Sequence, residues 1–272
     1  MKQVRPKKNL GQHFLTDLSI AKRIADTVDE PYGDLPVLEV GPGMGVMTQY
    51  LVEKDRPFKV VEIDKESVAY LKGTLFKDQE GMTADERIIS GDFLRMDLTK
   101  VFDGQQFVLT GNYPYDISSQ IFFKMLDNRD LIPCCTGMIQ HEVAVRMAAP
   151  PGNKQYGILS VLIQAWYNVE YLFTVEPTVF NPPPKVQSAV IRMTRNEVQH
   201  LGCDEKLFKQ VVKTVFNQRR KMLRVSLKQM LQDLTPLADH PFMTLRPEQL
   251  TIAQFVELTN EVEKSLCAYT KY

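Results

Sequence analysis

The chain has 272 residues, of which 44% are apolar and 24% charged. This is the composition of a globular protein rather than of a disordered, collagen-like or coiled-coil chain. Its apolar runs are too short to cross a bilayer and its basic start leads into no hydrophobic signal core, so we expect a cytoplasmic protein that contacts no membrane. The four cysteines lack zinc-ligand spacing, and neither a metal site nor a disulfide framework is predicted.

The 33 basic and 33 acidic residues cancel overall but are unevenly distributed. Residues 1–10 hold four basic side chains and no acid, and residues 206–228 hold eight and no acid. Without these twelve, the rest of the chain has 21 basic residues against 33 acidic ones. Segregation of this kind favours a surface that binds a polyanion such as a nucleic acid over two merely solvated faces.

Between residues 35 and 190, short β-rich runs alternate with helical patterns, which is the signature of βαβ units around a parallel sheet. A helical pattern over 19–28, with Asp17 as its cap, precedes the first run. The expected strands are 37–40, 59–62, 87–90, 107–110, 135–139, 167–174 and 189–193. The expected helices between them are 46–54, 65–76, 118–126 and 142–147.

From residue 204 onward the apolar residues recur at helical spacing and no strand is predicted. We therefore expect an α/β domain over residues 1–200, which begins with a basic segment and helix over 1–34, and a small all-helical domain over 201–272. Two further short helices are expected at 235–239 and 252–264. Basic side chains at helical steps form a stripe beside the apolar face, consisting of Lys206, Lys209, Lys213, Arg220, Arg224 and Lys228.

A glycine-rich turn follows the first expected strand at residues 41–45. Its G-x-G-x-G spacing differs from the dinucleotide fingerprint G-x-G-x-x-G. Glu62 ends the next strand, twenty-one residues after the first glycine, and can hold ribose hydroxyls, because Asp64 is expected to cap the following helix instead. Asp92 ends the third strand and can accept from an adenine amino group. Together these features resemble the S-adenosylmethionine site of class I methyltransferases.

The fourth expected strand ends in the tetrapeptide Asn112-Tyr113-Pro114-Tyr115. An exocyclic adenine amine is a poor nucleophile because its lone pair is delocalised into the ring. The Asn112 side chain and the Pro114 carbonyl offer two acceptors for the two amine hydrogens, which draws the nitrogen toward tetrahedral geometry. Tyr115 is positioned to stack on an extruded base. The motif resembles the Asn/Asp-Pro-Pro-Tyr/Phe box of amino methyltransferases that act on adenine.

Six further segments, in chain order, resemble the small-subunit (16S) rRNA adenine N6,N6-dimethyltransferases of the KsgA/RsmA type. They extend the likeness over nearly the whole chain. The segments are KNLGQHFL from Lys8, QHEVAVR from Gln140, YGILSV from Tyr156, FNPPPKVQS from Phe180, FNQRRKML from Phe216 and RPEQL from Arg246.

This resemblance implies a Rossmann-like, monomeric enzyme that uses S-adenosylmethionine, without a metal, to dimethylate two adjacent adenosines in the 3′-terminal hairpin of small-subunit rRNA. The implied cofactor residues are His13, Leu15, Glu39, Gly41, Gly43, Glu62, Asp92 and Asn112, with Glu39 supporting the glycine turn. The implied catalytic residues are Asn112, Pro114, Tyr115 and Phe180, the last as a second aromatic wall opposite Tyr115. The implied RNA contacts are Lys8, Arg146, Lys185, Arg219, Arg220, Lys221 and Arg224.

Two residues depart from the family pattern. His13 stands where many members of the family have asparagine. Tyr113 stands where an aliphatic residue is usual, so the sequence does not determine the width of the base pocket. Two other functions stay open as well: a macrolide-resistance type dimethyltransferase acting on large-subunit rRNA, and a non-catalytic RNA-binding assembly factor on the same fold. The FNPPPKV and RPE segments favour the small-subunit type over the first, and intact Glu62, Asp92 and Asn112 disfavour the second.

Overall fold

The computed structural model describes residues 7, 12–77 and 83–269. The chain forms two compact units: unit 1 comprises residues 1–144 and 169–195, and unit 2 comprises residues 145–168 and 196–272. The sequence assigned 145–168 to the first domain, whereas these residues belong to unit 2. The reason is helix α7 (Ile158–Gln164), whose apolar side chains are buried in contact with helix α8 (Glu205–Asn217).

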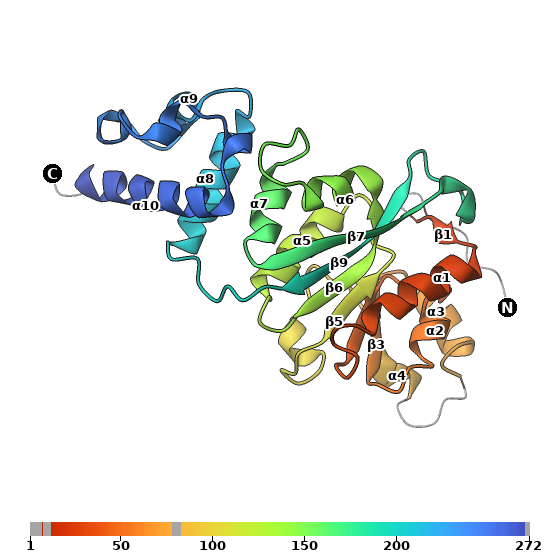
Figure 1. Cartoon of the computed structure of the whole chain (residues 1–272). Helices are drawn as coiled ribbons and strands as arrows, with labels where there is room; N and C mark the ends of the chain where they lie inside the picture. The colour runs from red at the N-terminus through yellow and green to blue at the C-terminus, as the bar shows by residue number, and fades with distance from the viewer. Residues whose placement is uncertain (1–6, 8–11, 78–82, 270–272) are drawn as a thin grey trace. The chain divides into compact units, whose positions relative to one another are not determined.

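Unit 1 is built on a seven-stranded sheet with the order β4-β3-β2-β5-β6-β9-β7 (Figure 1). The strands from β4 to β6 are parallel to their neighbours, and β9 runs antiparallel to β6. All seven expected strands are present, which confirms the prediction of an α/β fold with a mostly parallel sheet. They span Val37–Val40 (β2), Phe58–Glu62 (β3), Ile88–Ser90 (β4), Val108–Gly111 (β5), Cys134–Gln140 (β6), Tyr167–Val175 (β7) and Ser188–Arg195 (β9).

The helices of unit 1 follow the expected pattern with two exceptions: α2 (Thr48–Leu51) is shorter than expected, and α4 (Ala84–Arg87) was not predicted. Asp17 caps α1 by accepting from the main-chain N–H groups of Ser19 and Ile20. The helix expected over 46–54 is reduced to the four residues of α2. It ends in a tight turn, in which the Lys54 N–H bonds to the Leu51 carbonyl before β3 begins. The helices span Leu18–Ala25 (α1), Thr48–Leu51 (α2), Lys65–Gly73 (α3), Ala84–Arg87 (α4), Ser118–Asp127 (α5) and His141–Ala148 (α6), of which residues 145–148 belong to unit 2.

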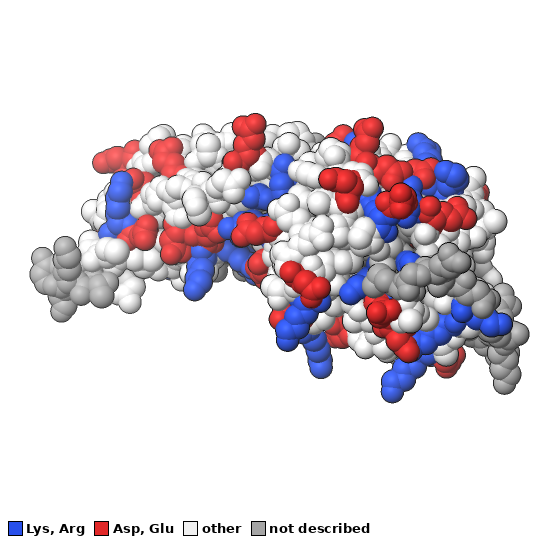
Figure 2. All heavy atoms as spheres, turned by 90° about the horizontal axis from the view of Figure 1, so that it is seen from below, with Lys and Arg blue, Asp and Glu red and all other residues white. Residues whose placement is uncertain are grey.

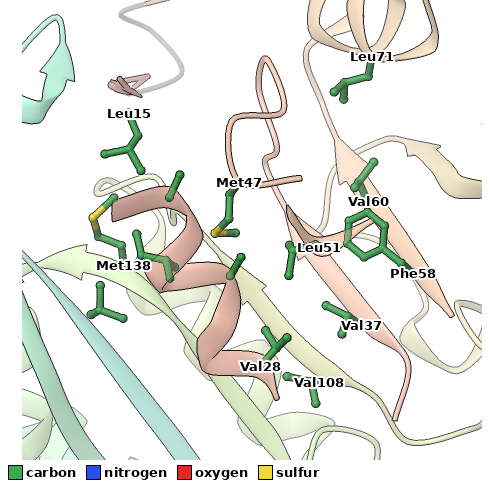
Figure 3. Close-up of a cluster of buried hydrophobic side chains, with 14 of the residues drawn as sticks. Leu15, Val28, Val37, Met47, Leu51, Phe58, Val60, Leu71, Val108 and Met138 are labelled. Atoms are coloured by element: carbon green, nitrogen blue, oxygen red, sulfur yellow. The ribbon is translucent and has the colours of Figure 1, made fainter. Parts of the chain in front are cut away.

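The main core of unit 1 joins α1, α2 and α3 to the strands of the sheet (Figure 3). Val37 and Val108 are paired residues at the start of the neighbouring strands β2 and β5, and Val28 follows α1. Leu15 and Met47 belong to the same cluster, and each of these five side chains is at most 5% exposed. Burial of apolar surface at about 25 cal/mol per Å² holds α1 and the glycine-rich turn before α2 against the strands.

A second, two-stranded sheet joins segments that are far apart in the sequence. Strand β1 (Phe14–Leu15) pairs antiparallel with β8 (Phe180–Asn181), with Leu15 opposite Phe180. The sequence did not predict it, because two residues give no alternating pattern and the partner strand lies beyond most of the domain. This pairing holds the amino-terminal segment beside the loop that precedes β9.

The carboxyl-terminal part of unit 2 is helical, with α8 capped by Asp204, then α9 (Leu223–Ser226) and α10 (Ile252–Tyr269). Its described part contains no strand after residue 195, as predicted. The basic residues of the predicted stripe do not share one helix: α8 ends at Asn217, and tight turns such as the Lys221 N–H to Gln218 carbonyl bond of 2.7 Å separate it from α9. Within the described ranges, no helix has the length and apolar character needed to cross a membrane.

Candidate active site

A cavity of about 280 Å³ opens at the carboxyl ends of the parallel strands of unit 1. Crevices at this edge of an open α/β sheet are the usual ligand sites of such folds. The cavity gathers almost all of the residues that the sequence assigned to cofactor and base from five separate segments. These lining residues are His13, Leu15, Glu39, Gly41, Gly43, Glu62, Asp92, Asn112, Pro114 and Tyr115.

The glycine-rich turn after β2 requires its glycines. Gly41, Gly43 and Gly45 have φ angles of 68°, 57° and 78°, in the left-handed region that side chains other than glycine rarely adopt. The turn is tied to the next strand by Glu62, whose carboxylate accepts from the Gly43 N–H at 3.0 Å and from the Asp64 N–H at 2.8 Å. Glu62 is 4% exposed, and burial raises the pKa of its carboxyl despite these two bonds.

Asp64 has the structural role that the sequence assigned to it. Its side chain accepts from the Glu66 N–H and caps α3, which confirms the predicted cap. It also forms an ion pair with Lys7 at 2.7 Å, and Glu66 is 3.0 Å from the same ammonium group. Asp64 is therefore directed away from the cavity, and Glu62 is the carboxylate that this strand end presents to it.

Glu39 is the second buried carboxyl at the cavity, at 2% exposure. It accepts from the Thr48 hydroxyl of α2 at 2.7 Å, whereas the main chain of the glycine turn is held by Glu62. Burial, opposed by the Thr48 bond and reinforced by the nearby charge of Glu62, raises the pKa of Glu39 to about 8. Glu39 therefore binds a proton at neutral pH in the free protein, and a cationic ligand would favour its release.

This raised pKa predicts a pH dependence of stability in the free protein. Between the ordinary pKa of 4.5 and about 8, the unfolded chain has an ionised Glu39 and the folded chain a protonated one, so the free energy of unfolding should fall as the pH rises. At about 1.4 kcal/mol per pKa unit, the fall attributable to Glu39 is at most about 5 kcal/mol. Urea unfolding at a series of pH values should show it, and Glu39→Gln should flatten it. Identical pH curves for the two proteins would contradict this.

Apolar residues that the sequence analysis missed line the same cavity beside the acidic ones. Ile63 follows Glu62 directly and is 54% exposed, and Phe93 and Leu94 follow Asp92. An exposed isoleucine at the mouth of a cavity offers a flat apolar surface for an aromatic ring. The signal was present in the sequence, since both strand-ending carboxylates are followed at once by large apolar residues. The Asp92 carboxylate accepts from the Leu94 N–H at 2.9 Å and remains one-third exposed.

The tetrapeptide after β5 lines the same cavity. The Asn112 amide nitrogen donates to the His13 carbonyl over 3.3 Å. The Pro114 carbonyl accepts from the Ile117 N–H at 3.2 Å, and a carbonyl oxygen has a second lone pair for another donor. The Tyr115 hydroxyl bonds to the buried Ser188, which fixes the ring, and the His13 ring lies against it with centroids 5.7 Å apart and planes at 27°.

Tyr113 lines the cavity, but its hydroxyl end lies inside the sheet. The residue is 1% exposed, and its hydroxyl donates to the Thr136 carbonyl at 2.9 Å, inside the sheet. Space for the ring comes from Gly137 of β6, where an added Cβ would lie 2.7 Å from a Tyr113 ring carbon and 2.3 Å from the Gly111 carbonyl oxygen. The ring at this position is thus accommodated by the space that Gly137 leaves in the neighbouring strand.

Phe180 lies in a different place from the one its expected role requires. Its side chain is 4% exposed in the core of unit 1, where β8 pairs with β1, and it does not line the cavity. In this conformation the ring that faces Tyr115 is that of His13. Phe180 could form a second wall for a base only if its ring turned outward.

The expected RNA contacts differ in how exposed they are. Lys8 lies outside the described residues. Lys185 of unit 1 and Arg220, Lys221 and Arg224 of unit 2 are exposed, and Arg146 lies half-buried in α6. On the face that Figure 2 draws, basic side chains lie interspersed with acidic ones.

Arg219 has a structural role within unit 2. Its guanidinium donates to the Asn153 carbonyl at 3.4 Å and lies 3.8 Å from the Glu248 carboxylate. It is therefore less available to a phosphate than its neighbours Arg220 and Lys221. Among residues 7, 12–77 and 83–269, no group of His, Cys, Asp or Glu side chains could hold a metal ion.

Comparison with known proteins agrees with this site. The family model "Ribosomal RNA adenine dimethylase" matches residues 3–264. A protein of Bacteroides fragilis named ribosomal RNA small subunit methyltransferase A is 66% identical over 266 residues, which are 98% of this chain and 95% of that protein. A dimethyladenosine transferase from Plasmodium falciparum superposes with a TM-score of 0.75 at 25% identity, covering 93% of this chain and 98% of that one.

The 23S rRNA methyltransferase ErmE also superposes, with a TM-score of 0.63 at 26% identity, covering 92% of this chain and 99% of that one. The Plasmodium and ErmE structures share the fold of this chain. In such α/β folds, ligands bind in the cavity at the carboxyl ends of the strands. The family model covers almost the entire chain, and the Bacteroides relative shares two-thirds of its residues. The chain belongs to the ribosomal RNA adenine dimethylase family.

Proposed function

We propose that this protein transfers methyl groups from S-adenosylmethionine to N6 of two adjacent adenosines in the 3′-terminal hairpin of small-subunit rRNA. The main support for this proposal is that one cavity is lined both by Asn112, Pro114 and Tyr115 and by the carboxylates Glu62 and Asp92. The substrate is the immature small subunit, and the enzyme works as a monomer in the cytoplasm. The Bacteroides relative, named as a small-subunit methyltransferase, supports this substrate.

The residues of the cavity fit S-adenosylmethionine. Glu62 has the acceptor oxygens for two ribose hydroxyls, Ile63 offers apolar surface to the adenine ring, and Asp92 can accept from its amino group. Two buried carboxyls, Glu39 and Glu62, favour a cationic ligand such as a sulfonium. When bound, the cofactor supplies an electrophilic methyl group.

The protein's own contribution to the chemistry is to hold the adenine amine. Asn112 accepts one amine hydrogen through its side-chain oxygen and the Pro114 carbonyl accepts the other, which localises the nitrogen lone pair toward the methyl group. Tyr115, fixed by Ser188, supports the base by stacking. Positioning and stabilisation of the developing positive charge account for the rate, so the reaction needs no covalent bond to the enzyme.

The rival functions are less well supported. A large-subunit dimethyltransferase has the same fold, as the ErmE structure illustrates, but at 26% identity against 66% for the small-subunit relative. A non-catalytic assembly factor would not need Asn112 and Glu62 in a cavity open to a ligand.

The decisive experiment is transfer of tritiated methyl groups to purified, unmethylated ribosomal subunits. We expect label in the small subunit and background in the large subunit. Label confined to the large subunit would favour the ErmE-like function instead, and label in neither would favour an assembly factor.

We further propose that the exposed cations of unit 2 bind rRNA phosphates. Each phosphate contact releases counterions, so the slope of log affinity against log salt changes by about 0.7 to 0.9 per contact. Replacing Arg220, Lys221 and Arg224 together by alanine should lower this slope by about two to three and leave cofactor affinity intact. Filter binding of small subunits across a salt series measures the slope, and calorimetry measures the cofactor affinity.

Two controls separate phosphate contact from other effects. Replacing Lys22, Lys72 and Lys100 of unit 1 removes the same charge from exposed positions and should leave the slope nearly unchanged. Arg219→Ala removes a side chain that holds Asn153 and Glu248, so its main effect should be on thermal stability. Equal slopes for the wild type and the Arg220/Lys221/Arg224 variant would mean that these three side chains are only solvated and do not bind phosphate.

A further inference from the structure

The main chain of the amino-terminal segment contacts the side chain of Asn112, which we propose to hold the reacting adenine amine. The Asn112 side-chain nitrogen lies 3.3 Å from the His13 main-chain oxygen. A carbonyl oxygen only accepts hydrogen bonds, so the branch of the planar amide that faces it must be the NH₂ group. The other branch, Oδ1, is then the one left for a ligand in the cavity that Asn112 lines.

His13 is held in this position by the segment that contains β8 and Pro182. The residues that follow it pair with β8, with Phe14 opposite Asn181 and Leu15 opposite Phe180. The His13 ring nitrogen Nδ1 bonds to the Pro182 carbonyl at 2.9 Å, continuing the contact between the same two segments. Leu15 and Phe180 are 5% and 4% exposed, so burial of both side chains anchors the two-residue strands that hydrogen bonds alone would hold weakly.

We propose that the main chain at His13 is a positioning element of the active site, which sets the amide of Asn112 so that Oδ1 faces the adenine amine. The inference rests on the proposed function, because it assigns Oδ1 to the amine of that substrate. It also gives a reason for the β1–β8 pairing, which the sequence did not reveal. Phe180 then contributes to catalysis by packing beneath β1, without touching the base in this conformation.

The proposal makes aspartate a poor substitute for Asn112, although aspartate has the same shape and one more acceptor. An ionised aspartate would direct an oxygen at the His13 carbonyl, where two acceptors repel each other. A protonated aspartate could donate to that carbonyl and keep its other oxygen for the amine. Facing a carbonyl also raises the pKa of such a carboxyl above its usual value of about 3.9. Activity of Asn112→Asp should therefore return as the pH falls.

The experiment compares single-turnover methyl transfer to small subunits by the wild type, Asn112→Asp and Asn112→Ala between about pH 8 and about pH 5. Relative to the wild type at the same pH, Asn112→Asp should be about a hundredfold slower at the upper end, by analogy with loss of a transition-state hydrogen-bond partner. It should recover at least about tenfold at the lower end, as expected for one pKa unit or more of protonation. Asn112→Ala cannot be protonated and should show no recovery.

Two further measurements keep the test decisive. Calorimetric titration with S-adenosylmethionine and thermal unfolding of each variant show whether the cavity is still folded. Wild-type-like activity of Asn112→Asp at about pH 8, or a loss with no recovery in a folded variant, would overturn the proposal. A wild type that methylates neither subunit would instead refute the proposed function.

Discussion

Replacing Asn112 by alanine is expected to slow methyl transfer by about a hundredfold or more, the effect of losing one preorganised hydrogen-bond partner in a transition state. The acceptor matters most as the amine becomes tetrahedral, so the loss should appear in turnover rather than in affinity for the subunit. The variant also frees the His13 carbonyl, but this segment remains held by its pairing with β8.

Single-turnover kinetics with saturating subunits and cofactor measure this loss. Asn128→Ala is the matched control, because Asn128 lies at the end of α5, where its amide donates to the Lys124 carbonyl, and does not line the cavity. The control should keep turnover within a few-fold of the wild type. If Asn112→Ala stays within the same range, the role assigned to Asn112 is wrong.

Replacing Glu62 by alanine is expected to weaken S-adenosylmethionine binding by about 1.5 to 3 kcal/mol, the range for hydrogen bonds to a charged group. This corresponds to roughly a tenfold to hundredfold rise in Kd. The structure favours the upper end, because the change removes the ribose acceptor and also the two bonds that hold the Gly43 and Asp64 main chain.

Calorimetric titration tests this, with Glu62→Gln and Glu66→Ala as companions. The glutamine variant keeps one acceptor oxygen and should lose less affinity than the alanine variant. Glu66 is exposed and bonds to Lys7 outside the cavity, so its loss should change Kd little. If Glu62→Ala bound S-adenosylmethionine with unchanged affinity, the end of β3 would not be part of the cofactor site.

The sheet and most of the candidate site could be predicted because they depend on local patterns. Parallel strands buried on both faces are continuous apolar runs, and the residues that follow them come together at one edge of the sheet by topology alone. Glu62, Asp92 and Asn112 each follow such a run, which is why three separate sequence positions could be assigned to one cavity.

What the sequence did not reveal depends on contacts between distant segments. The pairing of Leu15 with Phe180 has no local pattern, so Phe180 was assigned to the cavity wall when it lies in the core. The sequence did not determine how Tyr113 would be accommodated, which depends on the space that Gly137 leaves for its ring in the neighbouring strand. Both cases are decided by packing between strands, which a single sequence does not encode locally.

Nucleoside mass spectrometry of small-subunit rRNA after reaction with the wild type, with mapping of the modified positions, shows which nucleosides the protein methylates. We expect N6,N6-dimethyladenosine at two adjacent positions of the 3′-terminal hairpin, and far less of it in that hairpin with Asn112→Ala at matched time. Methylation of a different base, of another part of the rRNA, or only of the large subunit would contradict this expectation.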